Sequence, residues 1–145
     1  MDARLRPEDD FYGWAMAQSD AARRRAGNEL DWDGVSEELR LLGVSEEREL
    51  RSRYVVLFAH LLKWIVQPER RSRSWENTIA VQRDEIALHL KANPGLKARE
   101  AEIAGDAWRL ARRQASTETD LDLDLFPAEP PFTLDEARNE AWLPE

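Results

Sequence analysis

The 145-residue chain contains no cysteine. This absence excludes disulfides, thiolate metal sites and cysteine nucleophiles, and it fits a protein of the reducing cytoplasm. No apolar run reaches the roughly 18 residues that a membrane-spanning helix needs, and the opening MDARLRPE has no apolar signal region. We therefore expect a cytoplasmic protein that neither crosses a membrane nor is secreted.

Glycine and histidine are too scarce for the common nucleotide and metal sites. The six glycines stand at least seven residues apart, so there is no glycine-rich phosphate loop, and no serine lies in a Gly-x-Ser-x-Gly turn. The two histidines, His60 and His89, cannot form a three-histidine zinc site, and neither belongs to a Glu-x-x-His pattern. A site of both histidines with Glu85 is the metal arrangement left, although a lone helical histidine is more often an ordinary flank residue. The sequence therefore predicts no catalytic residues, no cofactor and no metal, and an enzyme is not expected.

The residues that are abundant favour helix. Alanine, leucine, arginine and glutamate dominate, whereas valine, isoleucine and threonine together number 14 of 145. Apolar spacing and capping signals predict five helices, over about 10–26, 31–42, 45–67, 73–92 and a last stretch that ends near Ala115. Gly43 is expected to end the second helix, and Ser45 to cap the third. Because 11 of the 13 residues in 54–66 are apolar, we expect this segment to be the buried central helix.

The last thirty residues differ from the rest. Leu121, Leu123 and Leu125 alternate with aspartates, and prolines follow, which favours an extended arm that places these leucines in grooves between helices. Thr133 and Glu136 form a capping box, so a short final helix should run to about residue 142. The sequence thus predicts a single all-α domain, 1–145, of about five helices. It is bundle-like, with an extended C-terminal arm and a short final helix.

Charge is distributed unevenly along this acidic chain. The net charge is −8, with −6 over residues 1–47, +5 over 48–73 and −8 over 116–145. An acidic protein repels the phosphates of duplex nucleic acid, so that partner is not expected. We expect the acidic arm, 118–129, to pack against the basic centre. Exposed ion pairs contribute little, so the leucines and Phe126 should supply most of the docking energy.

Three arginines form a basic corner between two predicted helices. Arg70, Arg71 and Arg73 precede a helix N-terminus, and Ser72 and Ser74 lie among them. Amide groups, the helix dipole and guanidinium groups together can bind an anion. The ligand could be a phosphate compound, a partner's carboxylates or a single-stranded nucleic acid. Pairing with the protein's own acids is the more common role of such a cluster.

Several sequence blocks resemble a known family. They are DFYGW (10–14), LDWDGVSEEL (30–39), LRSRYVVLFAHLLKW (50–64), QPERRSRSWENTI (67–79) and LFPAEPPFTLDEA (125–137). Over residues 8–145 the chain is similar to the bacterial family catalogued as domain of unknown function 29. The resemblance implies a bacterial, soluble, all-helical protein, and it implies no activity.

A helical scaffold with six tryptophans and no catalytic set favours a non-catalytic interaction module. Its partner would be another protein or a second copy of the chain. The alternative is binding of a phosphate ligand or single-stranded nucleic acid at the 70–73 corner.

Overall fold

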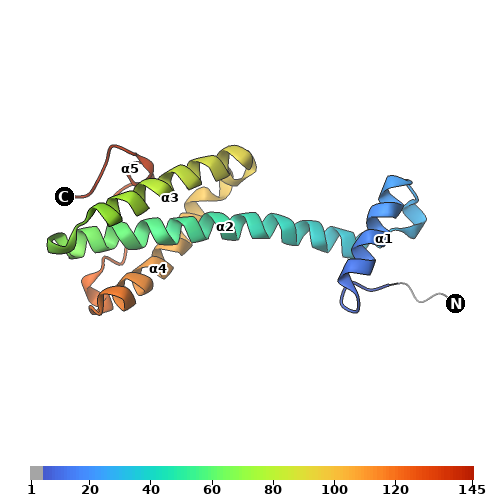
Figure 1. The fold of residues 1–145 in the computed structure, drawn as a ribbon, viewed down its shortest axis with the longest axis horizontal. Helices are drawn as coiled ribbons and strands as arrows, with labels where there is room; N and C mark the ends of the chain where they lie inside the picture. The colour runs from blue at the N-terminus through green and yellow to red at the C-terminus, as the bar shows by residue number, and fades with distance from the viewer. Residues whose placement is uncertain (1–4) are drawn as a thin grey trace. The chain divides into compact units, whose positions relative to one another are not determined.

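The computed structural model describes residues 5–145, and this part of the chain contains helices and no strand (Figure 1). The α-helices are α1 (Phe11–Arg23), α2 (Trp32–Val66), α3 (Arg73–Ala92), α4 (Glu100–Thr119) and α5 (Leu134–Arg138). Short 3-10 turns stand in the connections. The predicted all-α fold is confirmed.

The chain divides into two compact units. The N-terminal unit is Met1–Ser45 and the C-terminal unit is Glu46–Glu145, so α2 contributes to both. The N-terminal unit is a helical hairpin, in which Trp14 Nε1 donates to Asp31 Oδ2 (3.1 Å) and the Asp31 amide donates to Gln18 Oε1 (2.7 Å). The expectation of a single domain over 1–145 stays a prediction.

Three helices begin at capping residues that the sequence predicts. Asp10 accepts a hydrogen bond from the Gly13 amide (2.9 Å) at the start of α1. Ser72 accepts one from the Trp75 amide (3.2 Å) at the start of α3. Thr133 begins α5 with a complete capping box. Each cap satisfies an amide that has no partner inside its helix, and the three predicted starts are confirmed.

The predicted break at Gly43 is wrong, because α2 is one helix of 35 residues. Among the described residues no glycine has a positive φ, so Gly43 does not adopt the left-handed conformation of a helix cap. A glycine inside a helix costs only about 1 kcal/mol relative to alanine, and a long helix tolerates that loss. Ser45 accordingly lies within α2 and does not cap a new helix.

Gly43→Ala is expected to stabilise the first half of α2 by about 1 kcal/mol. A Cβ at this position would meet no heavy atom within 4 Å, so the gain in helix propensity is not offset by a clash. Hydrogen exchange of amides 40–48 should slow, and the helical circular dichroism signal should hold to a higher temperature. Faster exchange would instead indicate a left-handed glycine and two separate helices.

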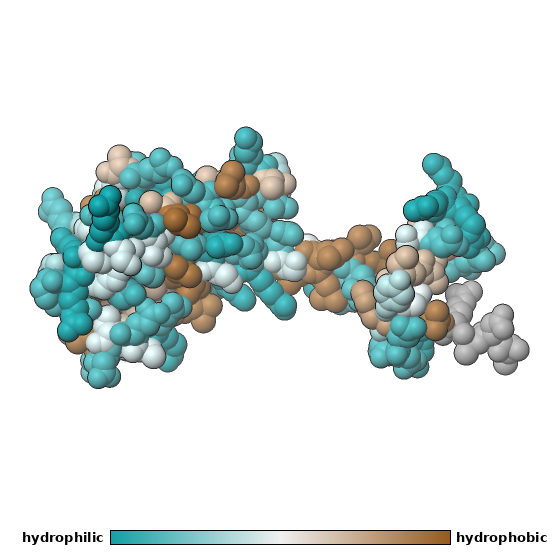
Figure 2. Space-filling model, in the orientation of Figure 1, coloured by the Kyte–Doolittle hydropathy of each residue, from teal (hydrophilic) through white to brown (hydrophobic). Residues whose placement is uncertain are grey.

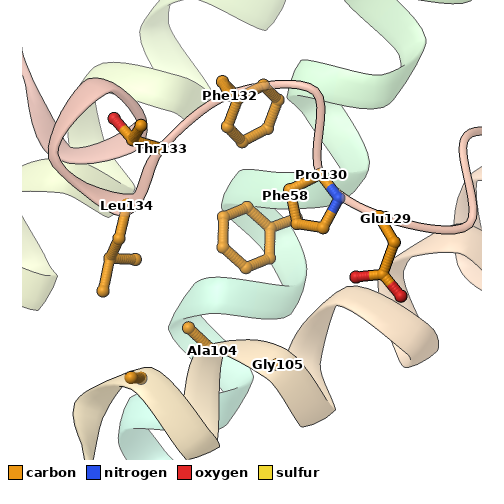
Figure 3. Close-up of a pocket in the computed structure, with 9 residues that line it drawn as sticks. Phe58, Ala104, Gly105, Glu129, Pro130, Phe132, Thr133 and Leu134 are labelled. Carbon is orange, nitrogen blue, oxygen red and sulfur yellow. The ribbon is translucent and has the colours of Figure 1, made fainter.

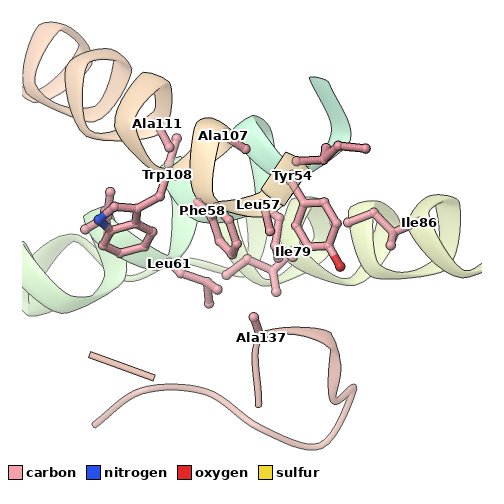
Figure 4. Close-up of a cluster of buried hydrophobic side chains, with 14 of the residues drawn as sticks. Tyr54, Leu57, Phe58, Leu61, Ile79, Ile86, Ala107, Trp108, Ala111 and Ala137 are labelled. Atoms are coloured by element: carbon pink, nitrogen blue, oxygen red, sulfur yellow. The ribbon is translucent and has the colours of Figure 1, made fainter. Parts of the chain in front are cut away.

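The core of the C-terminal unit surrounds the second half of α2, along which α3 and α4 lie (Figures 1 and 4). Phe58 of α2 and Trp108 of α4 meet edge to face, with ring centroids 5.4 Å apart. The buried residues of this stretch of α2 are Leu50, Tyr54, Leu57, Phe58, Ala59, Leu61, Leu62, Lys63 and Trp64. The prediction that 54–66 is the buried central segment is confirmed.

The arm packs on α4 through its backbone. Arg112 Nη2 donates to the Phe126 carbonyl (2.8 Å), and Trp108 Nε1 lies 3.1 Å from the carbonyl oxygens of Pro127 and Ala128. The Phe126 side chain is 1% exposed. Leu125 is 57% exposed, so its predicted place in a groove is wrong. A 3-10 turn over Leu123–Leu125 interrupts the alternation that a fully extended chain would keep.

Two predicted helix ends also need correction. α4 continues past Ala115 and ends at Thr119. The following residue, Asp120, caps the helix in the left-handed conformation, with a φ of 58°. α5 ends at Arg138, well before residue 142. The Asn139 side chain accepts a hydrogen bond from the Ala141 amide (2.9 Å), a local turn that competes with the helix.

Candidate functional site

Two residues of the basic corner, Arg71 and Ser72, make structural contacts within the protein. Arg71 Nε donates to the Trp64 carbonyl (2.8 Å), and its guanidinium lies 4.9 Å from the centroid of the Trp64 ring. Arg71 thereby satisfies a carbonyl near the end of α2 and stacks on an aromatic face. Ser72 caps α3, and Ser74 is exposed with its carbonyl accepting from Thr78 Oγ1 (3.1 Å).

Arg70 and Arg73 are the exposed arginines of this corner, while Arg71 is half-buried. Because the Ser72 hydroxyl already accepts a hydrogen bond from the Trp75 amide, an incoming anion would compete with this cap for the amide. The anion site at Arg70, Arg71, Arg73, Ser72 and Ser74 stays a prediction that now depends mainly on Arg70 and Arg73.

The end of α4, where the arm begins, meets the basic centre at Lys63. Glu118 Oε2 lies 2.7 Å from Lys63 Nζ, which also faces the Trp75 ring at 5.5 Å. Partial burial disfavours the charged carboxylate, but hydrogen bonds from Lys63 and Gln114 outweigh it and lower the pKa of Glu118 below its usual value. Beyond this pair, the described hydrogen bonds between the arm and the helices are with α4 and not with the arginine corner. α4 thus replaces the corner as the arm's main support.

The two histidines bind backbone carbonyls in different places. His60 Nδ1 lies 2.8 Å from the Val56 carbonyl, and His89 Nε2 lies 2.9 Å from the Glu46 carbonyl. Burial lowers the pKa of His60, and the nearby Lys63 ammonium acts in the same direction. Within residues 5–145 no group of three or more histidine, aspartate or glutamate side chains is placed to hold a metal ion. Glu85 lies 3.9 Å from Arg53, an ion pair that gives it a structural partner.

A polar cluster that sequence reasoning missed joins three helices. The hydroxyl of Tyr54 in α2 donates to Glu100 Oε1 of α4 (2.5 Å), and Arg138 of α5 lies 3.2 Å from the same oxygen. Burial is the main cause that raises the pKa of Tyr54, so the phenol stays neutral and acts as a donor. The three residues lie far apart in sequence and share no motif. Their contacts link helices within the core, which is a structural role.

A small pocket of about 260 Å³ lies beside the arm (Figure 3). Phe58, Ala104, Phe132 and Leu134 are among its lining residues, and Glu129 is the charged residue among those described. Ligand sites usually combine an apolar wall with several convergent polar groups. This pocket lacks such a set, so it does not indicate a catalytic or cofactor site.

A larger apolar groove lies in the N-terminal unit. We name it the α1–α2 groove; its volume is about 450 Å³, and α1, Leu30 and the first half of α2 line it. Its lining residues are Phe11, Trp14, Ala15, Gln18, Ser19, Ala22, Leu30, Val35, Glu38, Leu39 and Leu42. Leu39 and Leu42 are 63% and 64% exposed, and Figure 2 shows brown apolar atoms open to view along this part of α2.

The apolar surface extends beyond the groove. Tyr12, Met16 and Trp32 do not line the groove, and all three are more than half exposed. Across residues 5–45, Trp14 and Ala21 are the buried residues. The spacing of Phe11, Ala15, Gln18 and Ala22, and that of Trp32, Val35, Leu39 and Leu42, identifies these helix faces in the sequence. Spacing alone cannot distinguish a face that packs in a core from one that stays open.

The fold and its surfaces define a helical protein with a packed C-terminal unit and an open apolar hairpin. The family model described as domain of unknown function DUF29 matches residues 8–143. The chain belongs to this family. No curated protein and no solved structure is significantly similar to it. Among the described helices, none is long and apolar enough to cross a membrane.

Proposed function

We propose that the protein is a non-catalytic interaction module that binds a helical protein partner in the α1–α2 groove. The observation that carries this proposal is the exposure of Leu39 and Leu42 beside the groove, in a unit with almost no core of its own. Large apolar patches on a protein in water mark surfaces that other molecules cover. We further propose that the module acts in the cytoplasm.

The shape of the groove favours a helix as the bound element. Two helices side by side leave between them a channel into which the apolar face of a third helix fits. Apolar side chains dominate the described lining, and Gln18, Ser19 and Glu38 stand among them as polar groups that can orient a partner. A small polar substrate would find few hydrogen-bond partners there.

A capture experiment tests the proposal. The immobilised chain is incubated with native lysate beside the variant Leu39→Glu/Leu42→Glu, and bound proteins are identified by mass spectrometry. The wild type is expected to retain a protein that the variant loses, because two carboxylates in the groove oppose burial by an apolar helix.

Leu88→Glu is the matched control, since Leu88 is a 61% exposed leucine on α3 in the other unit. It should capture the same protein as the wild type. Identical captures by the wild type and by Leu39→Glu/Leu42→Glu would contradict the proposal.

A further inference from the structure

We infer that the occupant of the α1–α2 groove is a second copy of this chain. The hairpin of one copy packs face to face on the hairpin of the other, and the two form a four-helix bundle about a twofold axis. This inference rests on the proposed function, because it names the partner of the same groove. A twofold interface uses the same patch on both copies, so the patch must be able to pack against itself.

Both helices of the hairpin carry the spacing that such a bundle requires. Phe11, Ala15, Gln18 and Ala22 follow intervals of four, three and four residues on α1. Trp32, Val35, Leu39 and Leu42 follow intervals of three, four and three on α2. Alternating intervals of three and four place side chains along one nearly straight seam, as in four-helix bundles. Ala15 and Ala22 on α1 leave hollows that larger residues of α2, such as Leu39 and Leu42, can fill.

Few charged side chains line the groove itself. Glu38 is the charged residue among the described lining residues. Some other charges of the hairpin are paired within one copy: Arg24 lies 2.9 Å from Asp20 and 2.7 Å from Glu29. Glu37 similarly lies 2.8 Å from Arg40. The lining of the groove therefore carries little charge, and the surrounding residues 1–47 have a net charge of −6.

The open area suits a stable dimer. Aromatic side chains each carry about 150–250 Å² of surface. The exposed fractions of Phe11 (54%) and Trp32 (64%) therefore leave on the order of 250 Å² open beside the groove. Leu39 and Leu42 add to this area, and Tyr12 and Met16 extend the apolar surface next to it toward the roughly 800 Å² that each partner contributes to a standard interface.

The hairpin also needs its partner permanently. With Trp14 and Ala21 as the buried residues of 5–45, its own core is too small to hold two helices together. A partner that is present wherever the chain is made meets this need, and a second copy is always present.

Light scattering coupled to size-exclusion chromatography tests the inference on the purified chain over a wide concentration range. For the wild type and Leu88→Glu, the molar mass measured by light scattering is expected to be twice the 16.8 kDa of one chain. Leu39→Glu/Leu42→Glu should weaken dimerisation by about a hundredfold or more, since four carboxylates would enter one apolar interface. A monomeric wild type, or a dimer that the double variant leaves intact, would overturn the inference.

Cross-linking of single-cysteine variants tests the same interface without placing charges in the groove, so its result does not depend on whether Leu39→Glu/Leu42→Glu unfolds the hairpin. The chain has no cysteine, so Leu42→Cys and the control Leu88→Cys each introduce a single thiol on an exposed helix position. A short bismaleimide is expected to join two copies through Leu42→Cys and not through Leu88→Cys. Equal yields from the two variants would also overturn the inference. A monomeric wild type whose groove still captures another protein from lysate would reject the second copy and leave the proposed function standing.

Discussion

Trp108→Ala is expected to lower the free energy of unfolding of the C-terminal unit by about 3–5 kcal/mol. The indole is almost completely buried, and it contacts Phe58 and Phe132 edge to face at centroid distances of 5.4 and 5.5 Å. Its removal leaves a cavity between α2, α4 and the arm. It also removes the donor that the Pro127 and Ala128 carbonyls share. Urea unfolding followed by circular dichroism measures the loss.

Leu110→Ala on the same helix is the control for this result. Leu110 is 48% exposed, so its truncation should change the free energy of unfolding by about 0.5 kcal/mol or less. If both substitutions cost the same, Trp108 would not be part of the core.

Phe126→Ala is expected to release the arm and to cost about 3–5 kcal/mol. Phe126 is the arm residue whose side chain is fully buried, and Arg112 holds the backbone at the same point. Limited proteolysis should cleave the variant across 118–130 much faster than the wild type. High salt should change the wild-type rate only slightly, because apolar burial outweighs the exposed charges.

Leu125→Ala is the neighbouring control. Its side chain points into solvent, so the variant should resist proteolysis as the wild type does. Rapid cleavage of the wild type at low salt would show that the arm is not docked.

The wrong prediction for Leu125 has a local cause. Period-two alternation assumes an extended backbone, in which Leu121, Leu123 and Leu125 share one face. The Asp122 side chain accepts a hydrogen bond from the Asp124 amide (3.1 Å), and the resulting turn rotates Leu125 away from α4. Phe126 then takes the buried place. A turn of this kind depends on one side-chain contact, which residue spacing does not reveal.

The basic corner illustrates a different limit. Three arginines close in sequence suggest one surface, yet Arg71 turns inward to the Trp64 carbonyl and leaves Arg70 and Arg73 exposed. The Trp64 carbonyl is free to accept from Arg71 only because α2 ends at Val66, two residues further on. Composition can therefore identify a charged segment, but the geometry of neighbouring helix ends decides which charges remain available.

The sequence by itself determined the helical class, the start of each capped helix and the burial of 54–66. These features depend on interactions within a few residues or on an apolar run too long to leave in water. The tertiary structure decided whether Gly43 interrupts a helix, which arm residue is buried and how Tyr54, Glu100 and Arg138 meet. It alone distinguished the packed faces of α2–α4 from the open α1–α2 groove. An apolar stripe has the same spacing in both cases, and only the presence or absence of a second layer against it separates a core from a binding surface.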